Sequence, residues 1–268
     1  MTHRKRRRAI ILVVYALLVF GIVWWIVAAL RPTQSCSDGV QNQNETGVDC
    51  GGVCGACTVV LETKDIVIDG SYVIDGVDGR IDAVAQITNP NHRFGASRIA
   101  YTFVLKAADG TVIGERTGTT FILPAETKYV LEPGITVTNN VSVAQAEFSI
   151  TDVKWKLFEG YQEPRIVVLN KSYTLASSDT AYSRVSGLVR NESPFDFTSI
   201  RINVVLKDKD GIPIAIHRTR MDTFDSGMER DFSLPWPQKF SGEVATVDVE
   251  VEANVFDVDN YRKHHIIQ

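Results

Sequence analysis

Four cysteines are the residues of this chain whose type and spacing could do chemistry. They lie within 22 of the 268 residues, and the sequence contains no others: Cys36, Cys50, Cys54 and Cys57. In an oxidising compartment an even, clustered set forms two disulfides, and three connectivities are open. A zinc site is the alternative, because Cys54 and Cys57 have the spacing of a zinc half-site. However, 13 residues separate Cys36 from Cys50, which is too many for the second half of a zinc site. A thioredoxin-like redox pair at Cys54 and Cys57 would require a surrounding βαβ pattern, which the sequence lacks. We therefore predict two disulfides.

Oxygen-bearing side chains fill the segment between these cysteines. Glycines that allow tight turns are interspersed among them, at Gly39, Gly47, Gly51 and Gly52. Calcium takes about six to eight oxygen ligands from carboxylates, amides and carbonyls, so the segment is a candidate Ca²⁺ site. The candidate ligands are Asp38, Asn42, Glu45 and Asp49. The alternative is that these side chains accept hydrogen bonds within local turns and bind no metal. Ca²⁺ is the one cofactor that the sequence suggests.

The cysteine segment resembles a short motif of bacterial surface and secreted proteins, C-x-DG-x-x-N-x-x-E-x-x-x-DCGG-x-C-x-x-C. The match covers residues 36–57 and includes the four cysteines, the four candidate ligands and the Gly51-Gly52 pair. The resemblance implies an extracellular location.

An uncharged apolar segment precedes the cysteines. Residues 9–30 carry no charge and, as a helix, would span about 33 Å against a hydrocarbon core of about 30 Å. A cleaved signal peptide is the alternative, but its apolar region is only about 7–15 residues long. Five Lys and Arg residues lie in positions 1–8, and only Arg31 lies between the segment and Lys64. The positive-inside rule therefore predicts a single-pass cell-membrane protein with a basic cytoplasmic tail (1–8), a transmembrane helix (9–30) and extracytoplasmic C-terminal domains.

The remainder of the chain is acidic. Without residues 1–8, 23 basic residues stand against 32 acidic ones, which gives a net charge of −9. Nucleic-acid binding requires a basic surface, so we expect no nucleic acid among the partners. A hydrophobic content of 44% also argues against a disordered chain.

The chain beyond residue 58 is predicted to form antiparallel sheets in two copies of one domain. Short runs of Val, Ile, Thr and aromatic residues alternate with polar residues and are separated by Gly, Asn, Asp and Pro. An apolar run that ends at Asn89 recurs 102 positions later at Asn191, and Asp109-Gly110 recurs 101 positions later as Asp210-Gly211. A period near 100 residues is that of a domain with room for about seven strands. We therefore expect a cysteine-rich stalk (31–58) and two domains (59–163 and 164–268).

The repeat also predicts local structure. Asp-Gly pairs between alternating strands are typical of hairpin turns. Asn89 and Asn191 each end a strand, where we expect the amide to bond neighbouring backbone. In the second copy the residues expected to face a core are Ile200, Ile202, Val204 and Leu206. Those expected to face solvent are Arg201, Asn203, Val205 and Lys207.

Both copies resemble the FxLYD and water-stress (WHy, late-embryogenesis) group of immunoglobulin-like sandwiches. In each copy the Asn is followed by a Phe, Phe94 or Phe195, then by an apolar strand and the Asp-Gly pair. Residues 103–107 and 204–208 keep part of the F-x-L-Y-D signature. The resemblance covers most of residues 70–262. It implies a mainly β fold, in which the transmembrane helix is followed by two tandem immunoglobulin-like β-sandwich domains with no shared catalytic residues.

The sequence contains no catalytic motif such as a nucleophile elbow, a Walker loop or HExxH. Trp236 is the candidate binding residue, because flanking prolines often hold such a ring in an exposed loop, where it could stack on sugars; packing in a core or between domains is the favoured alternative. We therefore expect a non-catalytic adhesion or interaction module of the cell surface or envelope, with a protein or an envelope polymer as partner. The alternatives are an accessory subunit of a membrane or envelope machine and a surface hydrolase.

Overall fold

The structure is a computed structural model that describes residues 3–29, 36–42, 44–57, 62–76, 79–137, 142–158, 162–178 and 181–263. The chain divides into two compact units, residues 1–62 and 63–268. The first contains a helix and the cysteine segment, and the second contains the strands. The predicted domain boundary at 163/164 lies inside the second unit and stays a prediction.

Helix α1 (His3–Ala29) forms the apolar segment. It begins at His3 rather than at residue 9, so most of the predicted basic tail is helical. Between Arg6 and Ala29 it is long and apolar enough to cross a membrane, a test that an N-terminal signal sequence also passes. Leu30 and residues 31–35, where we predicted the end of the helix and the start of the stalk, lie outside the described residues.

The strands of the second unit form four antiparallel sheets in the described part of the chain, and the first half of the unit contains two of them. One has the order β1-β2-β5 and the other the order β4-β3-β6. The bounds are β1 (Val67–Asp75), β2 (Ile81–Thr88), β3 (Phe94–Lys106), β4 (Val112–Ile122), β5 (Thr127–Ile135) and β6 (Gln145–Leu157).

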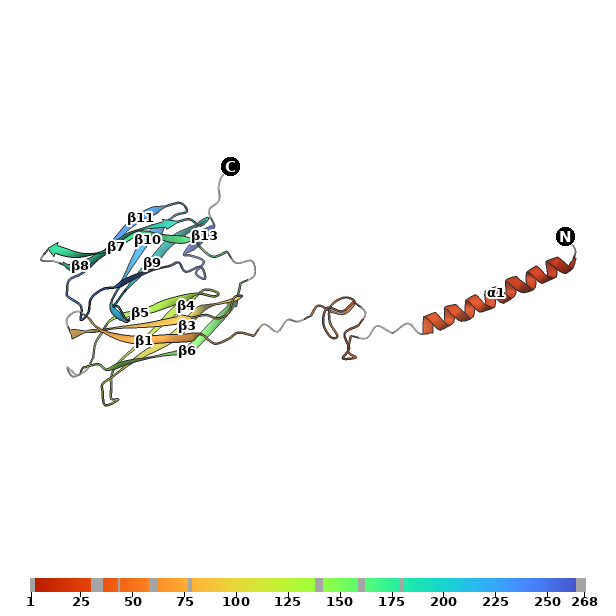
Figure 1. Ribbon diagram of the computed structural model, residues 1–268, viewed down its shortest axis with the longest axis horizontal. Helices are drawn as coiled ribbons and strands as arrows, with labels where there is room; N and C mark the ends of the chain where they lie inside the picture. The colour runs from red at the N-terminus through yellow and green to blue at the C-terminus, as the bar shows by residue number, and fades with distance from the viewer. Residues whose placement is uncertain are drawn as a thin grey trace. The chain divides into compact units, whose positions relative to one another are not determined.

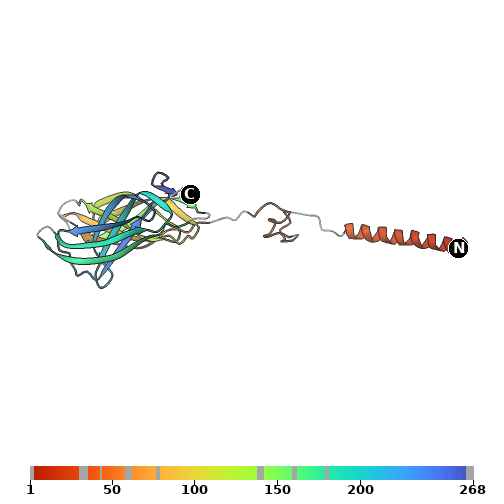
Figure 2. The same ribbon diagram turned by 90° about the horizontal axis from the view of Figure 1, so that it is seen from above.

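The second half contains the other two sheets. Their orders are β11-β8-β7 and β10-β9-β12, with β13 also paired to β9. The bounds are β7 (Ile166–Ser178), β8 (Ala181–Asn191), β9 (Phe195–Lys207), β10 (Pro213–Phe224), β11 (Glu229–Trp236), β12 (Thr246–Glu252) and β13 (Tyr261–Lys263). Figure 1 shows the two halves stacked on each other, and in Figure 2 strands of the second half lie over those of the first.

Each half has its own hydrophobic core, and both of its sheets contribute to that core. In the first half, Ile87 of β2 and Val130 of β5 belong to the same cluster as Phe103 of β3. In the second half, Phe232 of β11 belongs to the same cluster as Val204 of β9. Burial of each large apolar side chain contributes about 1.5–3 kcal/mol, so the cores stabilise both pairs of sheets. The prediction of a mainly β fold behind one apolar helix is confirmed.

The sequence repeat is also a structural repeat where β2 and β8 end. Asn89 Nδ2 donates to the carbonyl of Phe94 at 2.7 Å and to the carbonyl that follows β4 at 2.8 Å. Asn191 Nδ2 donates in the same way to Phe195 at 2.7 Å and to the last residue of β10 at 3.2 Å. Both side chains are buried. The predicted structural role of the two asparagines is confirmed, because each amide ties a strand end to two other backbone segments.

The two Asp-Gly pairs form hairpin turns as predicted. They join β3 to β4 and β9 to β10, which are antiparallel neighbours. Gly110 and Gly211 have φ of 86° and 78°, which favours glycine over residues with a Cβ.

Strand β9 differs from the prediction on its second face. Val204 faces the core of its own half, as expected. Val205 and Asn203, which we expected to face solvent, are only 1% and 2% exposed. Val205 clusters with Ile216 of β10 and with Leu131 of β5, because the first half covers this face of the sheet. Alternation shows which side chains share a face but not what covers the other face, so the solvent-facing prediction is wrong for these two residues.

Candidate functional site

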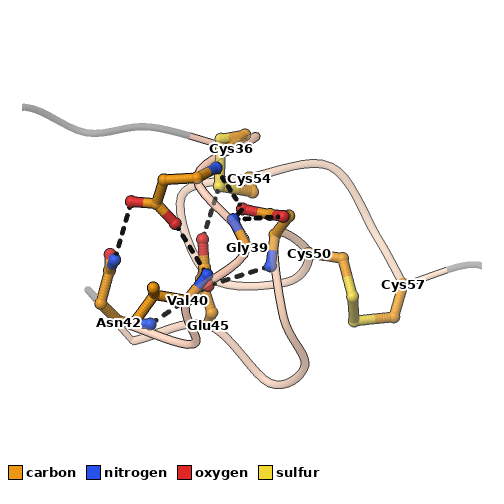
Figure 3. Close-up of a disulfide and its surroundings, with 10 residues drawn as sticks. Cys36, Gly39, Val40, Asn42, Glu45, Cys50, Cys54 and Cys57 are labelled. Carbon is orange, nitrogen blue, oxygen red and sulfur yellow. Dashed lines mark hydrogen bonds between the residues drawn. A yellow bond between two sulfur atoms is a disulfide. The ribbon is translucent and has the colours of Figure 1, made fainter.

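The cysteine segment of residues 36–57 is the first candidate site, and two disulfides hold it (Figure 3). Cys36 bonds Cys54 with a Cα–Cα distance of 5.6 Å, and Cys50 bonds Cys57 at 4.8 Å. No cysteine is free. The predicted disulfides are confirmed, and one of the three connectivities is selected. Disulfides persist in oxidising environments, which indicates an extracytoplasmic exposure of the segment.

Asp38 and Asp49 accept hydrogen bonds from the backbone of the same segment. Asp49 Oδ1 accepts from the N–H of Asp38 at 2.8 Å, and its Oδ2 accepts from the N–H of Gly39 at 2.9 Å. Asp38 Oδ1 accepts from the N–H of Val40 at 2.9 Å, and its Oδ2 accepts from Asn42 Nδ2 at 3.0 Å. The Val40 N–H and the Asn42 amide hold the pKa of Asp38 below its ordinary value. The Asp38 carboxylate therefore closes a local turn, whereas the Asp49 carboxylate ties residues 38 and 39 to a position ten or eleven residues later. Figure 3 shows the labelled partners Gly39, Val40 and Asn42 within this segment.

Glu45 is the buried member of the four candidate ligands, with 8% of its surface exposed. Its Oε2 accepts from the N–H groups of Asn42 and Asp49, both at 3.2 Å. Its Oε1 lies 3.2 Å from Cys54 Sγ, which cannot donate because a disulfide sulfur carries no proton. The backbone packs closely here: a Cβ on Gly52 would lie 2.3 Å from a carbonyl oxygen, so the turn requires glycine.

The structure brings the four predicted calcium ligands together but uses their oxygens within the protein. All three carboxylates accept hydrogen bonds from groups of the segment. Within the described ranges, no three His, Cys, Asp or Glu side chains are placed to hold a metal ion. Asn42 Oδ1 is buried without a hydrogen-bond partner there, but one orphaned oxygen is far from the six or more that Ca²⁺ requires. Metal-free turns account for the observed bonds, and calcium binding stays a prediction.

Trp236, the candidate binding residue, ends β11 and is not presented as an exposed ring. Only 7% of its surface is exposed, and its Nε1 donates to the carbonyl of Ile216 at 3.3 Å. Its ring lies 5.4 Å from that of His217 and 6.0 Å from that of Phe240, both edge-on. Pro235 fits here because β11 is an edge strand, where proline is tolerated. Packing accounts for most of the ring, and a binding role stays a prediction.

A set of polar and charged side chains joins the two halves of the second unit, and none of them is among the predicted site residues. Lys128 of β5 has a side chain with no exposed surface, and its Nζ lies 2.6 Å from Glu252 Oε1 of β12. The two groups form an ion pair, although the angle is not that of a hydrogen bond. Arg201 Nη1 of β9 lies 3.1 Å from Glu252 Oε2. We call this group the seam, and it comprises Lys128, Tyr129, Arg201, Lys207, Asp248, Glu250 and Glu252.

The other acidic residues of the seam bind the outer edge of β5. Tyr129 donates its hydroxyl to Asp248 Oδ2 at 2.9 Å, and the same oxygen lies 2.8 Å from Lys207 Nζ. The backbone N–H of Tyr129 donates to Glu250 Oε2 at 3.1 Å. Strand β5 is at the edge of its sheet, so it has no neighbouring strand on its outer side. The Glu250 carboxylate takes the place of such a strand as the acceptor for the Tyr129 N–H.

Burial and charge act on the pKa values of the seam. Burial raises the pKa of Glu250 to about 8. Burial also tends to raise the pKa of Glu252, but the positive charges of Lys128 and Arg201 outweigh this effect, so the pKa of Glu252 is lowered. Burial tends to lower the pKa of Lys128, but the carboxylates of Glu252, Glu126 and Glu250 outweigh this effect and raise it. Lys128 is therefore charged at neutral pH and compensates the carboxylates around it.

A weak sequence signal for the seam exists. Residues 247–252 read VDVEVE, and such alternation is typical of a strand with one apolar and one solvated face. Residues 128–131 read KYVL, in which a lysine begins an apolar run. Only the pairing of these two segments shows that the acidic face is covered, and neither segment predicts that pairing by itself.

No protein-family model matches this chain, and no curated protein matches its sequence. The resemblances of the cysteine segment and of the two repeats therefore remain interpretations of sequence patterns. The proposal below depends on the observed helix, disulfides and strands.

Proposed function

We propose that this protein is a non-catalytic interaction module of the cell surface or envelope, anchored in the membrane by α1 with the cysteine segment and the strands outside. The order of parts along the chain carries the proposal. A helix able to span a membrane is followed by a segment with two disulfides and then by the strand unit. The disulfides favour an oxidising compartment, and the basic residues at positions 4–8 favour a cytoplasmic N-terminus.

We further propose that each half is an immunoglobulin-like sandwich and that the two stand in tandem. Two sheets contribute to one core in each half, and the equivalent asparagines at the ends of β2 and β8 support a common origin. The seam and the apolar cluster that contains Val205, Ile216 and Leu131 favour a single rigid body rather than two domains that move independently. A rigid body outside the membrane suits the presentation of a surface to a protein or an envelope polymer.

The test is a pull-down of the full chain after mild solubilisation, with a matched variant as control. In this variant the apolar part of α1 is replaced by a leucine-alanine helix of equal length. We expect both proteins to retain the same partner, because the strand unit makes the contact. A stoichiometric membrane partner that is lost with the replaced helix would contradict the proposal. It would favour the alternative of an accessory subunit whose anchor helix is its interface.

A further inference from the structure

A pocket of about 450 Å³ opens at the junction of the two halves. The end of β1, the start of β2 and a turn within β5 contribute residues from the first half. Strand β10, the end of β11 and the segment after it contribute residues from the second half. Ligand sites have volumes of about 300–1,000 Å³, so the size suits a small molecule or one unit of a polymer. The lining side chains include Arg80, Asp82, His217, Arg218, Trp236 and Lys239.

The aromatic wall of the pocket is held rigidly. The bond from Trp236 Nε1 to the Ile216 carbonyl fixes the indole, and the rings of His217 and Phe240 pack against it edge-on. Pro235 and Pro237 restrict the backbone on both sides of Trp236. A preformed wall of this kind lowers the entropy cost of binding a ligand.

Three cations line the pocket: Arg80, Arg218 and Lys239. None of them forms an ion pair within 4 Å with a carboxylate in the parts of the chain that the structure describes. Arg80 lies over Gly134, where its Cδ and Nη1 would be 3.6 and 3.7 Å from an added Cβ, and Gly134 has a φ of 71°. The left-handed backbone at this position favours glycine, and the Arg80 side chain lies in van der Waals range of it at the pocket.

The carboxylates of the pocket do not cancel these charges. Asp82 Oδ1 accepts from the N–H of Gly134 at 2.8 Å, so this side chain ties the start of β2 to β5. Asp75 is the other acidic residue among the described lining residues, and it is exposed. Among these described residues, three cations against two carboxylates leave one net positive charge. In addition, His217 has a buried Nδ1 without a hydrogen-bond partner among the described residues, so the wall keeps one unused polar atom.

We propose that this pocket binds a single carboxylate carried on a ring-shaped or apolar body. The guanidinium groups match a carboxylate in geometry, and the net charge of the lining matches one negative charge better than the two of a phosphate monoester. The aromatic wall takes the uncharged body of the ligand. The proposal refines the proposed function, because it names the ligand class that the module would recognise on an envelope polymer or as a free small acid.

The test measures binding to the full chain in phosphatidylcholine nanodiscs by saturation-transfer NMR. The probes form two matched pairs, methyl glucuronide with methyl glucoside and phenylacetate with phenylacetamide. We expect the acid of at least one pair to bind about tenfold or more tightly than its neutral match. The glucuronide pair reports an acidic sugar as the source of the carboxylate, and the phenylacetate pair reports a free aromatic acid.

Variants tie the binding to the pocket. Arg80→Gln and Lys239→Gln change exposed side chains and are not expected to disturb folding, whereas Arg218→Gln changes a partly buried one. Each is expected to weaken binding of the acid about tenfold. Lys209→Gln, in the β9–β10 hairpin and outside the pocket, is the control and should bind as the unchanged protein does.

Three results would overturn the proposal: no binding of either acid at millimolar concentration, equal binding of acid and neutral probe, or unchanged binding in both Arg80→Gln and Lys239→Gln. None of them would affect the proposed function, because the pull-down requires neither these side chains nor a carboxylate ligand. Conversely, loss of the partner with the replaced helix would leave acid binding intact.

Discussion

Replacing Lys128 with Met is expected to destabilise the strand unit by about 3–5 kcal/mol at pH 7, the range for removing one member of a buried ion pair. The substitution keeps a long side chain but removes the charge that faces Glu252 at 2.6 Å. Glu126 and Glu250 would lose the same compensating charge. Urea unfolding of the full chain in micelles, followed by circular dichroism of the strands, measures the free energy of unfolding.

The loss of stability caused by Lys128→Met should depend on pH and should be larger at higher pH. In the unchanged protein the lowered pKa of Glu252 gives stability that is present above the ordinary pKa of 4.5 and lost as pH falls through the folded value. Glu250, with a pKa raised to about 8, gives stability that is lost as pH rises from 4.5 to that value. Without Lys128, Arg201 still pairs with Glu252, but the charge of Glu250 loses its main compensation and is relieved by protonation. We therefore expect the largest deficit at pH 8 and a much smaller one near pH 4.5.

Two further variants separate the seam from a general surface effect. Lys209 pairs with Asp210 on the surface, with 83% of its side chain exposed, so Lys209→Met should change stability by no more than about 0.5 kcal/mol. Combining Lys128→Met with Glu252→Gln removes both charges of the pair and should recover part of the loss. A Lys128→Met deficit equal to that of Lys209→Met, or one independent of pH, would contradict the described seam.

Removing the Cys36–Cys54 disulfide by the double substitution Cys36→Ser and Cys54→Ser is expected to destabilise the cysteine segment by about 3 kcal/mol. This bond closes a sequence separation of 18 residues, and the loss of the closure frees the segment that contains Asp38, Glu45 and Asp49. We expect fast proteolysis within residues 36–57, measured by mass spectrometry on the full chain in nanodiscs.

The second disulfide provides the matched comparison. Cys50 and Cys57 are separated by only 7 residues, so the Cys50→Ser and Cys57→Ser pair should destabilise the segment by about 1 kcal/mol less. The unfolding of residues 63–268 should be unchanged in both variants, because the strands form a separate compact unit. Equal proteolysis rates in the two variants, or a lower stability of the strands, would show that the segment is not held as described.

Features set by neighbouring residues could be predicted from sequence. Asn89 and Asn191 were found because each amide bonds backbone close in sequence, at Phe94 and Phe195. The Asp-Gly hairpins were found for the same reason. The presence of disulfides followed from four clustered cysteines, but their pairing did not, because the three connectivities differ only in how the segment folds.

Features set by contact between distant segments could not be predicted. The acidic face of β12 and the outward face of β9 both have the alternation of a solvated strand, yet the first half of the unit covers them. For Trp236 the flanking prolines suggested an exposed binding ring and packing was the favoured alternative; the indole packs inward at the end of an edge strand, which also tolerates Pro235. For both strands the period of the pattern was right, and the identity of the covering element decided the exposure.

The proposed membrane orientation is tested by a protease experiment on intact cells or spheroplasts that carry the full chain with a tag before residue 1. We expect external protease to digest residues 63–268 while the tag and α1 stay protected together in the membrane. Protection of residues 63–268 with digestion of the tag would contradict the orientation. A mature protein that has lost the tag and α1 would instead show that the helix is a cleaved signal sequence and would contradict the anchor.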